Sequence, residues 1–399
     1  MGNDERYARQ KLIQWWDQEK LQAARVMVIG AGALGNEVLK NLALLGIGHL
    51  LVIDFDIIEP SNLSRTVLFQ ETDIKESKVE MAAQAVHRLN PAVHIETING
   101  DIFYDVGLGH YRHSDLAIGC LDSLAARAQT GLGCTLGGIP FLDGGMWSLG
   151  GEVRWFMAGD GPCFDCTMGS EDRARADERR QCQGYRSMAW DASQQVATVI
   201  STSAIIGGIL AQEAAKYLCG YEVLAGRALV YNGQRLSLHR TEFERDPNCP
   251  SSHTPYEGVI ELPHRAAELT PRALLQIARE QANQRFDVPI PPGDDELAVE
   301  LGRDFLIALD CPACGAHEDV NQVWGKVLEN QQACPHCGTL RKAENVRSIT
   351  ASSPYADRSL AQLGVPPGEV LAIFGAPDLL LFELTGDLPR TGQQGVDDD

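Results

Sequence analysis

A glycine-rich turn between a predicted strand and a predicted helix constrains the fold of this chain most. Arg25–Ile29 is a short β-branched run, typical of a buried parallel strand, and the turn Gly30-x-Gly32-x-x-Gly35 follows it. Such glycines let the backbone approach phosphates, while the N-terminus of the next helix supplies unpaired N–H groups. Asp54 ends the next strand, where a carboxylate can bind ribose hydroxyls. The pattern predicts a nucleotide site, with a nicotinamide or flavin dinucleotide as the default ligand and a purely structural turn as the alternative.

Strand and helix patterns alternate along the first part of the chain. Their order predicts a Rossmann-like α/β fold, with a doubly wound, mostly parallel sheet and helices on both faces. An antiparallel extension is expected from a strand at Glu152–Met157 and a hairpin at Arg227–Arg240 with an Asn232-Gly233 turn, and the charged segment 169–188 is expected to be a crossover loop. The other predicted strands lie at Leu50–Asp54, His94–Asn99, Asp115–Gly119 and Ile139–Asp143, and the helices at Lys75–Leu89, Leu124–Leu136, Thr198–Leu218 and Pro271–Gln284.

Length and charge limit the class of protein. The 399 residues accommodate two domains, expected at 1–253 and 254–399. The net charge of −20 argues against a nucleic-acid-binding surface. No apolar stretch approaches the length of a membrane span, and the polar start has no signal-peptide pattern. We expect a cytoplasmic protein with neither a membrane nor a nucleic-acid partner.

Polar and cationic side chains beyond Asp54 favour a triphosphate ligand over a dinucleotide. Developing negative charge on a triphosphate must be neutralised, whereas NAD has no γ-phosphate and does not need these groups. Asp122 follows another strand at the same sheet edge, where a Mg²⁺ carboxylate would stand. Taken singly, the side chains are also compatible with solvated charges, and Asp122 with a helix cap. The group after Asp54 comprises Asp56, Asn62, Arg65 and Lys78.

Two motifs together resemble one family. The run from Gly30 to Arg65 resembles the adenylating domain shared by ubiquitin-activating enzymes and the MoeB/ThiF proteins, and Arg6-Tyr-Ala-Arg9-Gln10 resembles their N-terminal RYxRQ signature. The resemblance implies use of ATP and Mg²⁺ to adenylate the C-terminal glycine of a ubiquitin-like or sulfur-carrier protein. Thr66 departs from the family, which usually has Gln there.

The resemblance also implies roles for single residues. Asn62, Arg65 and Lys78 would hold the triphosphate, and Asp122 would coordinate Mg²⁺. Arg9 would reach the phosphates in the neighbouring subunit's site, which implies a homodimer. The residues expected to bind the nucleotide are Gly30, Gly32, Gly35, Asp54, Asp56, Asn62, Arg65, Lys78 and Asp122.

A first zinc site is predicted around Cys163-Phe-Asp-Cys166, because such a knuckle after a Gly-Pro turn usually supplies half of a tetrahedral site. In MoeB-like relatives a second CxxC pair after the C-terminal hairpin completes it. This chain has Cys249-Pro-Ser-Ser-His253 there instead, an acceptable ligand spacing. We therefore expect Cys163, Cys166, Cys249 and His253 as ligands, the alternative being an exposed His253 beside a degenerate site.

Cys182 is the candidate nucleophile. It lies in a polar stretch with Arg179, Arg180 and Arg186 nearby, and adjacent cations favour the thiolate that attacks an acyl-adenylate. Its position, after the first CxxC and before a buried helix, also resembles that of the catalytic cysteine in compact ubiquitin-activating enzymes. A loop cysteine without a role and a sulfur-relay cysteine are the alternatives.

A zinc ribbon is predicted at 311–338 from two paired knuckles, a second structural zinc site. His317 and His336 are expected to be bystanders. The second module is expected to dock the ubiquitin-like protein or a conjugating enzyme. The ligands of this ribbon would be Cys311, Cys314, Cys334 and Cys337.

Three functions remain open. The first is an activating enzyme for a ubiquitin-like modifier, similar to those of bacterial (Bil-type) conjugation operons linked to antiphage defence, which forms a thioester on Cys182 and passes it to a conjugating enzyme. The second is a MoeB/ThiF-type adenylyltransferase for cofactor sulfuration. The third, a nicotinamide oxidoreductase, explains only the glycine turn and Asp54.

Overall fold

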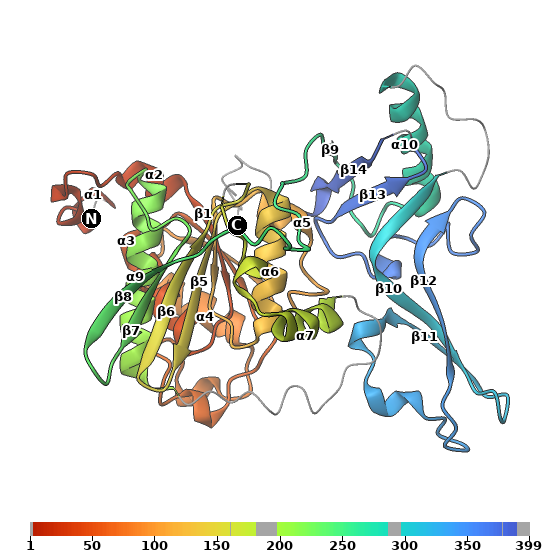
Figure 1. Cartoon of the computed structure of the whole chain (residues 1–399), viewed down its shortest axis with the longest axis horizontal. Helices are drawn as coiled ribbons and strands as arrows, with labels where there is room; N and C mark the ends of the chain where they lie inside the picture. Colours follow the sequence, from red (N-terminus) through yellow and green to blue (C-terminus); the bar gives the residue numbers. More distant parts are fainter. Residues whose placement is uncertain (1–2, 160, 181–197, 286–296, 377, 389–399) are drawn as a thin grey trace, which may run out of the picture. The chain divides into compact units, whose positions relative to one another are not determined.

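The computed structural model describes residues 3–159, 161–180, 198–285, 297–376 and 378–388 (Figure 1). The chain forms two compact units. The first comprises Met1–Asp105, Tyr111–Arg180 and Ala189–Tyr256, and the second Val106–His110, Gln181–Met188 and Glu257–Asp399. Within the described ranges, no helix has the length and apolar character needed to cross a membrane.

The first unit is built on an eight-stranded sheet with the order β3-β2-β1-β4-β5-β6-β7-β8. Neighbours from β3 to β5 pair in parallel, and those from β5 to β8 pair antiparallel. This confirms the predicted Rossmann-like fold with its antiparallel extension. The strands are β1 (Arg25–Ile29), β2 (His49–Ile53), β3 (His94–Ile98), β4 (Leu116–Gly119), β5 (Phe141–Trp147), β6 (Gly150–Phe156), β7 (Arg227–Asn232) and β8 (Ser237–Glu242).

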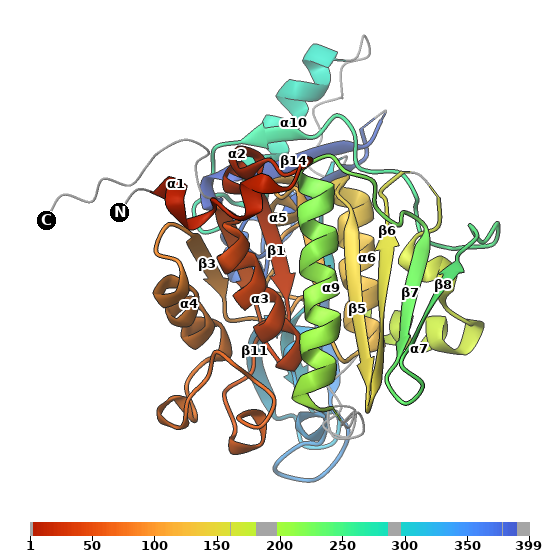
Figure 2. The same ribbon diagram turned by 90° about the vertical axis from the view of Figure 1, so that its left-hand side faces the viewer.

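Helices cover both faces of this sheet. Figure 2 shows α3, α4 and α9 in front of the strands, with α6 behind them. The apolar sides of α3, α4 and α9 pack with β1, β2 and β6 into one large core that includes the fully buried Leu39, Leu42 and Trp155. The helices of the first unit are α1 (Asn3–Arg6), α2 (Gln18–Ala23), α3 (Ala33–Leu45), α4 (Lys78–Leu89), α6 (Leu124–Gly137), α7 (Ser170–Arg180) and α9 (Ile200–Leu218). The short α5 (Leu108–Arg112) begins in the chain range of the second unit and ends in that of the first.

Two predicted boundaries, the start of α4 and the turn of the hairpin, differ from the structure. Helix α4 begins at Lys78 and not at Lys75, because Lys75 has φ +77°, outside the helical region. The hairpin pairs Asn232 with Ser237, so its loop is longer than the predicted Asn232-Gly233 turn. These boundaries depend on single backbone conformations that residue patterns do not specify.

The predicted crossover loop 169–188 was also partly wrong, because it begins with helix α7. Glu171 and Asp172 lie in its first turn, where acidic side chains interact favourably with the helix dipole. Ala176 is buried, and α7 packs against α6. The segment has too few apolar residues to show a helical period, so the sequence did not predict this helix. Most of the stability of a helix in a protein comes from tertiary contacts, which a sequence pattern does not show. The rest of the predicted loop lies outside the described residues.

The second unit contains a six-stranded sheet with the order β11-β10-β13-β14-β9, in which β12 also pairs with β10. The long strand β10 is buried along most of its length and pairs with three neighbours. Helix α10 packs against β10 and β12. The elements are β9 (Ile260–Leu262), α10 (Pro271–Arg285), β10 (Ala298–Asp310), β11 (His317–Val323), β12 (Lys342–Thr350), β13 (Val370–Phe374) and β14 (Leu380–Leu384).

Candidate functional site

The carboxyl ends of three parallel strands meet at one edge of the first unit's sheet. Ile29 is opposite Ile53 of β2 and opposite Gly119 of β4. The backbone N–H of Gly30 donates to the Ile53 carbonyl at 2.8 Å, and that of Cys120 to the Ile29 carbonyl at 2.8 Å. The segments that follow the three strands therefore begin side by side, which is where open α/β sheets bind ligands.

The three glycines of the turn have different surroundings. Gly30 has φ +97°, and a Cβ added there would lie 2.5 Å from the Cys120 carbonyl oxygen. A Cβ on Gly35 would lie 1.9 Å from the carbonyl oxygen of Gly30. Both glycines are thus needed for packing. A Cβ on Gly32, the N-terminal cap of α3, would meet no atom within 4 Å. Gly32 therefore faces open space at a helix N-terminus, where a phosphate can approach the backbone.

Asp54 joins this turn to the end of β2. One carboxylate oxygen accepts from the Ala31 N–H at 2.7 Å, and the other from the Asp56 N–H at 2.9 Å. Burial raises the pKa of Asp54, opposed by the nearby positive charge of Lys78 and by these two hydrogen bonds. The carboxylate therefore organises the loop in addition to any contact it makes with a ribose.

Lys78 is paired with the loop that follows β2. Its Nζ donates to Asp56 Oδ2 at 2.6 Å, and its backbone N–H donates to the Asp56 carbonyl at 3.1 Å. The Lys78 side chain is only 10% exposed, whereas that of Asp56 is 51% exposed. The first residue of α4 is thereby fixed against the loop that follows β2.

Asn62 and Arg65 lie on the loop between β2 and α4. The Asn62 side-chain carbonyl accepts from the Glu59 N–H at 3.0 Å, so this half of the amide shapes the loop. Arg65 donates to the Ser61 carbonyl at 3.1 Å and stays partly exposed. Thr66, which departs from the family pattern, is buried and donates to the Asn62 carbonyl at 3.0 Å.

Asp122 is exposed in the turn between β4 and α6. It does not cap the helix, because the cap is Ser123, whose hydroxyl accepts from the Ala126 N–H. Within the described ranges, no side chain or backbone group pairs with the Asp122 carboxylate. Its oxygens are therefore available to a ligand.

Sequence reasoning missed a buried ionic group behind this turn. Asp143 of β5 is completely buried, and Arg154 of β6 donates to its Oδ2 from Nε at 2.9 Å and from a terminal nitrogen at 2.6 Å. Arg127 of α6 approaches the same oxygen at 3.5 Å. The pairing of Asp143 opposite Arg154 follows from the register of the β5–β6 hairpin, which could have predicted it.

In the N-terminal signature, Arg6, Tyr7 and Gln10 form hydrogen bonds with other parts of the chain, whereas Arg9 is exposed. Tyr7 is buried, and its hydroxyl accepts from Asn90 at 2.8 Å. Arg6 donates to the Leu89 carbonyl at 2.9 Å, and Gln10 to the Leu44 carbonyl at 3.3 Å. Among the residues that the structure describes, none forms a side-chain hydrogen bond or ion pair with Arg9.

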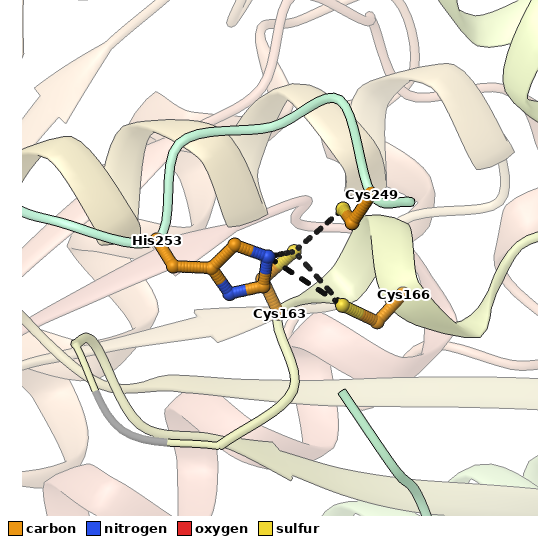
Figure 3. A group of neighbouring side chains, drawn as sticks. All are labelled: Cys163, Cys166, Cys249 and His253. Atoms are coloured by element: carbon orange, nitrogen blue, oxygen red, sulfur yellow. Dashed lines mark hydrogen bonds between the residues drawn. The ribbon is translucent and has the colours of Figure 1, made fainter. Parts of the chain in front are cut away.

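Figure 3 shows Cys163, Cys166, Cys249 and His253 pointing toward one another. Cys163 Sγ lies 3.7 Å from Cys166 Sγ, 3.7 Å from Cys249 Sγ and 3.8 Å from His253 Nε2, and Cys166 Sγ lies 3.7 Å from the same nitrogen. Zinc bond lengths place the ligand atoms of a tetrahedral site about 3.5–3.8 Å apart. The geometry and the donor set therefore fit zinc. Burial lowers the pKa of His253, so the ring favours its neutral, ligating form.

Side chains around this cluster join its two halves. Arg173 of α7 donates to the Asp165 carbonyl at 3.0 Å, inside the first knuckle, and to Asp246 Oδ2 at 2.9 Å, before Cys249. The hydroxyl of Ser251 donates to the carboxylate of Asp165. Because these bonds connect segments far apart in the chain, they hold the cluster's ligands in register.

The four ribbon cysteines also converge, since their sulfur atoms all lie within 4.8 Å of one another. The two knuckles have the same backbone geometry. In one, Gly315 has φ +73° and donates to the Cys311 carbonyl at 3.0 Å; in the other, Gly338 has φ +74° and donates to the Cys334 carbonyl at 2.8 Å. His317 pairs with Asp310 and Asp319 and is not a member of this cluster.

The remaining cysteines include the candidate nucleophile. Cys182 lies outside the described residues. Cys134 and Cys219 are buried, and Cys120 packs against the glycine turn. Burial raises the pKa of all three thiols, as is usual for cysteines that pack as small apolar residues.

Comparison with known proteins identifies the family. The ThiF family matches residues 5–251. The molybdopterin-synthase adenylyltransferase of Escherichia coli is 30% identical over 250 residues, 61% of this chain and 94% of that protein. The sulfur carrier protein adenylyltransferase of Thermus thermophilus is 31% identical over 62% of this chain and 89% of that protein. The SAMP-activating enzyme E1 of Haloferax volcanii is 30% identical over 58% of this chain and 82% of its own length.

Solved structures show the same fold. A crystal structure of E. coli MccB with AMPCPP and MccA has a TM-score of 0.52 at 21% identity, covering 62% of this chain and 74% of MccB. The family match covers nearly all of the first unit's chain and ends before Glu257, where the main part of the second unit begins. Over residues 5–251, more than half of its length, the chain matches the ThiF family, and it belongs to that family.

Proposed function

We propose that this protein is an ATP-dependent adenylyltransferase that activates the C-terminal glycine of a ubiquitin-like or sulfur-carrier protein. One observation carries the proposal: Gly32 faces open space at the N-terminus of α3, beside Asp54, where the carboxyl ends of three strands meet. Triphosphate binding needs such an approach to the backbone. The activities named for the related adenylyltransferases support the same reaction.

The side chains at this edge suit a triphosphate. Lys78 and Arg65 would hold it, with Lys78 exchanging Asp56 for phosphate oxygens. Asp122 offers an exposed carboxylate for Mg²⁺, which, when bound, neutralises charge on the phosphates. A carboxylate oxygen of the carrier protein's C-terminal glycine attacks the α-phosphorus of ATP. The bond between the α-phosphorus and the oxygen that bridges it to the β-phosphorus breaks, and pyrophosphate leaves.

We further propose that Cys182 carries the second step. Its thiolate attacks the acyl carbon, a carbon–sulfur bond forms, and AMP leaves with the electron pair of the broken carbon–oxygen bond. A conjugating enzyme's cysteine then accepts the acyl group, as in bacterial ubiquitin-like conjugation linked to antiphage defence. The support is the sequence around Cys182 and its position between the first knuckle and α9.

Sulfur-carrier activation is the second candidate, because the similar adenylyltransferases from E. coli and T. thermophilus have that name. The adenylate would then be converted to a thiocarboxylate without a thioester on Cys182. The first step is the same in both candidates, so only the fate of the adenylate distinguishes them.

The other parts receive structural or docking roles. Zinc at each cysteine cluster would cross-link distant segments, and the second unit would dock the carrier or the conjugating enzyme. Because the ThiF family match ends at residue 251, deleting the residues after Glu261 should spare adenylation and, if the second unit docks the partner, impair transfer.

The exposed Arg9 would complete the site of a partner subunit in a homodimer.

Exchange of labelled pyrophosphate into ATP tests the proposed function. Purified protein is assayed with bacterial ubiquitin-like and sulfur-carrier proteins that end in Gly-Gly, and we expect exchange with at least one of them. Binding of a nicotinamide dinucleotide without any binding of MgATP would refute the proposal.

The thioester step needs a separate assay. Cys182→Ala should retain exchange and form no thiol-sensitive adduct, while the matched Cys134→Ala variant should form it. An adduct that persists in Cys182→Ala would remove this cysteine from the mechanism and leave the adenylation step standing.

A further inference from the structure

Arg127 connects two elements at the edge of the sheet. It lies on the first turn of α6, and its side chain is only 13% exposed. Its Nε donates to the Leu121 carbonyl at 2.9 Å, and a terminal nitrogen donates to the Gly144 carbonyl of β5 at 3.0 Å. One planar guanidinium thus links the turn before α6 to the neighbouring strand.

The linked turn presents Asp122. Leu121 precedes that residue and Ser123, the helix cap, follows it. In the part of the chain that the structure describes, nothing pairs with the Asp122 carboxylate, so its position depends on the backbone of the turn. The bond from Arg127 to the Leu121 carbonyl ties that backbone to α6, and the same guanidinium reaches β5 at Gly144.

Neutralising the charge of Asp143 is not the main role of the Arg127 side chain. Arg154 already donates to Asp143 Oδ2 with two nitrogens, at 2.9 and 2.6 Å. The approach of Arg127 to the same oxygen is longer, at 3.5 Å. The shorter hydrogen bonds of Arg127 go to the two carbonyls, which indicates that its main work is to join the turn to β5.

We propose that Arg127 is a positioning residue that sets the metal-binding geometry of Asp122. The inference rests on the proposed function, in which Asp122 binds Mg²⁺. A planar fork can satisfy two carbonyls in fixed directions, whereas a lysine has a single flexible ammonium group. Loss of the fork frees the turn, and a displacement of about 1 Å at a catalytic group can cost about 100-fold in rate.

The test measures metal binding and needs no carrier protein. Mn²⁺ replaces Mg²⁺ as the probe, and protein-bound Mn²⁺ is measured by equilibrium dialysis with the same concentration of ATP on both sides of the membrane, so that chelation by ATP alone cancels. Arg127→Lys should weaken Mn²⁺ binding about tenfold, with unchanged affinity for metal-free ATP. Arg154→Lys is the matched control: it removes a buried arginine from the same Asp143 and should change the melting temperature without changing Mn²⁺ affinity.

A double variant separates positioning from general damage. Asp122→Ala should weaken Mn²⁺ binding at least as strongly, and adding Arg127→Lys to it should cause no further loss. If Arg127→Lys weakens binding equally in the presence and absence of Asp122, the positioning role is overturned and the proposed function stands. If Asp122→Ala leaves Mn²⁺ binding intact, the assignment of Asp122 in the proposed function fails, and this inference fails with it.

Discussion

Lys78 of α4 and Asp56, in the loop after β2, form an ion pair, with Nζ 2.6 Å from Oδ2. The lysine is nearly buried and its partner is half exposed. A lysine held in this way is positioned before ligand arrives, and a phosphate can replace the more exposed carboxylate without a large movement of the lysine stem.

Replacing Lys78 tests this arrangement. Lys78→Met should reduce pyrophosphate exchange by about 100-fold or more, because a preorganised cation facing developing phosphate charge is lost. The exposed Lys75→Met, three positions earlier, should stay within about twofold of the parent. Equal losses in both variants, measured with the same carrier protein, would contradict the assignment.

The glycines of the turn should respond differently to alanine. Gly35→Ala should lower stability by about 3 kcal/mol, because its Cβ would collide with the Gly30 carbonyl. Gly32→Ala should change stability by less than about 1 kcal/mol, since its φ is −72° and its Cβ meets no atom. Calorimetric titration should nevertheless show weakened ATP binding in Gly32→Ala, and unchanged affinity would exclude close approach of phosphate to this residue.

Asp54 should impose an acid limit on ATP binding. Burial raises its pKa, so the carboxylate takes up a proton at higher pH than an ordinary aspartate and loses its acceptor role as pH falls. Folding stability depends on pH in the opposite direction to ATP affinity. Because the pKa of Asp54 is raised in the folded state, protonation of Asp54 stabilises that state at low pH, and this contribution is lost as pH rises through the folded pKa. Affinity for ATP measured from neutral to acidic pH should fall in the parent, and Asp54→Asn should lack that dependence.

Zinc content should report the two cysteine clusters independently. The full chain should contain two zinc ions per protomer, and either His253→Ala or Cys311→Ser should reduce this to one. Cys219→Ala, which changes a buried cysteine outside both clusters, is the control and should retain two. Elemental analysis that finds full zinc in His253→Ala would remove this histidine from the site.

Subunit mixing should test Arg9. Arg9→Ala should fold normally because its side chain is exposed, yet lose most of its exchange activity. Mixing it with inactive Lys78→Met should restore part of the activity, since a mixed dimer contains one site with both an intact Lys78 and an intact Arg9. No recovery from a demonstrated mixed dimer would contradict a contribution across the interface.

The sequence by itself determined the elements whose signals are local. The strand Arg25–Ile29, the glycine turn and α3 are encoded by a β-branched run, by residues without Cβ atoms and by an apolar helical period, which lie within one continuous segment. The same holds for the paired CPxC knuckles of the ribbon. The order of the predicted strands along the chain is compatible with few sheet topologies, because crossover connections between parallel strands are almost always right-handed.

Only the tertiary structure decided how distant residues meet. Cys163 and His253 come together because α7, through Arg173, holds segments that are far apart in the chain. The pairing of Lys78 with Asp56 and the bond from Arg127 to Leu121 depend on backbone direction at loop ends, which no residue pattern specifies. Such contacts arise from the packing of whole elements. The sequence could therefore indicate which residue types take part in the site, whereas the contacts between them were visible only in the tertiary structure.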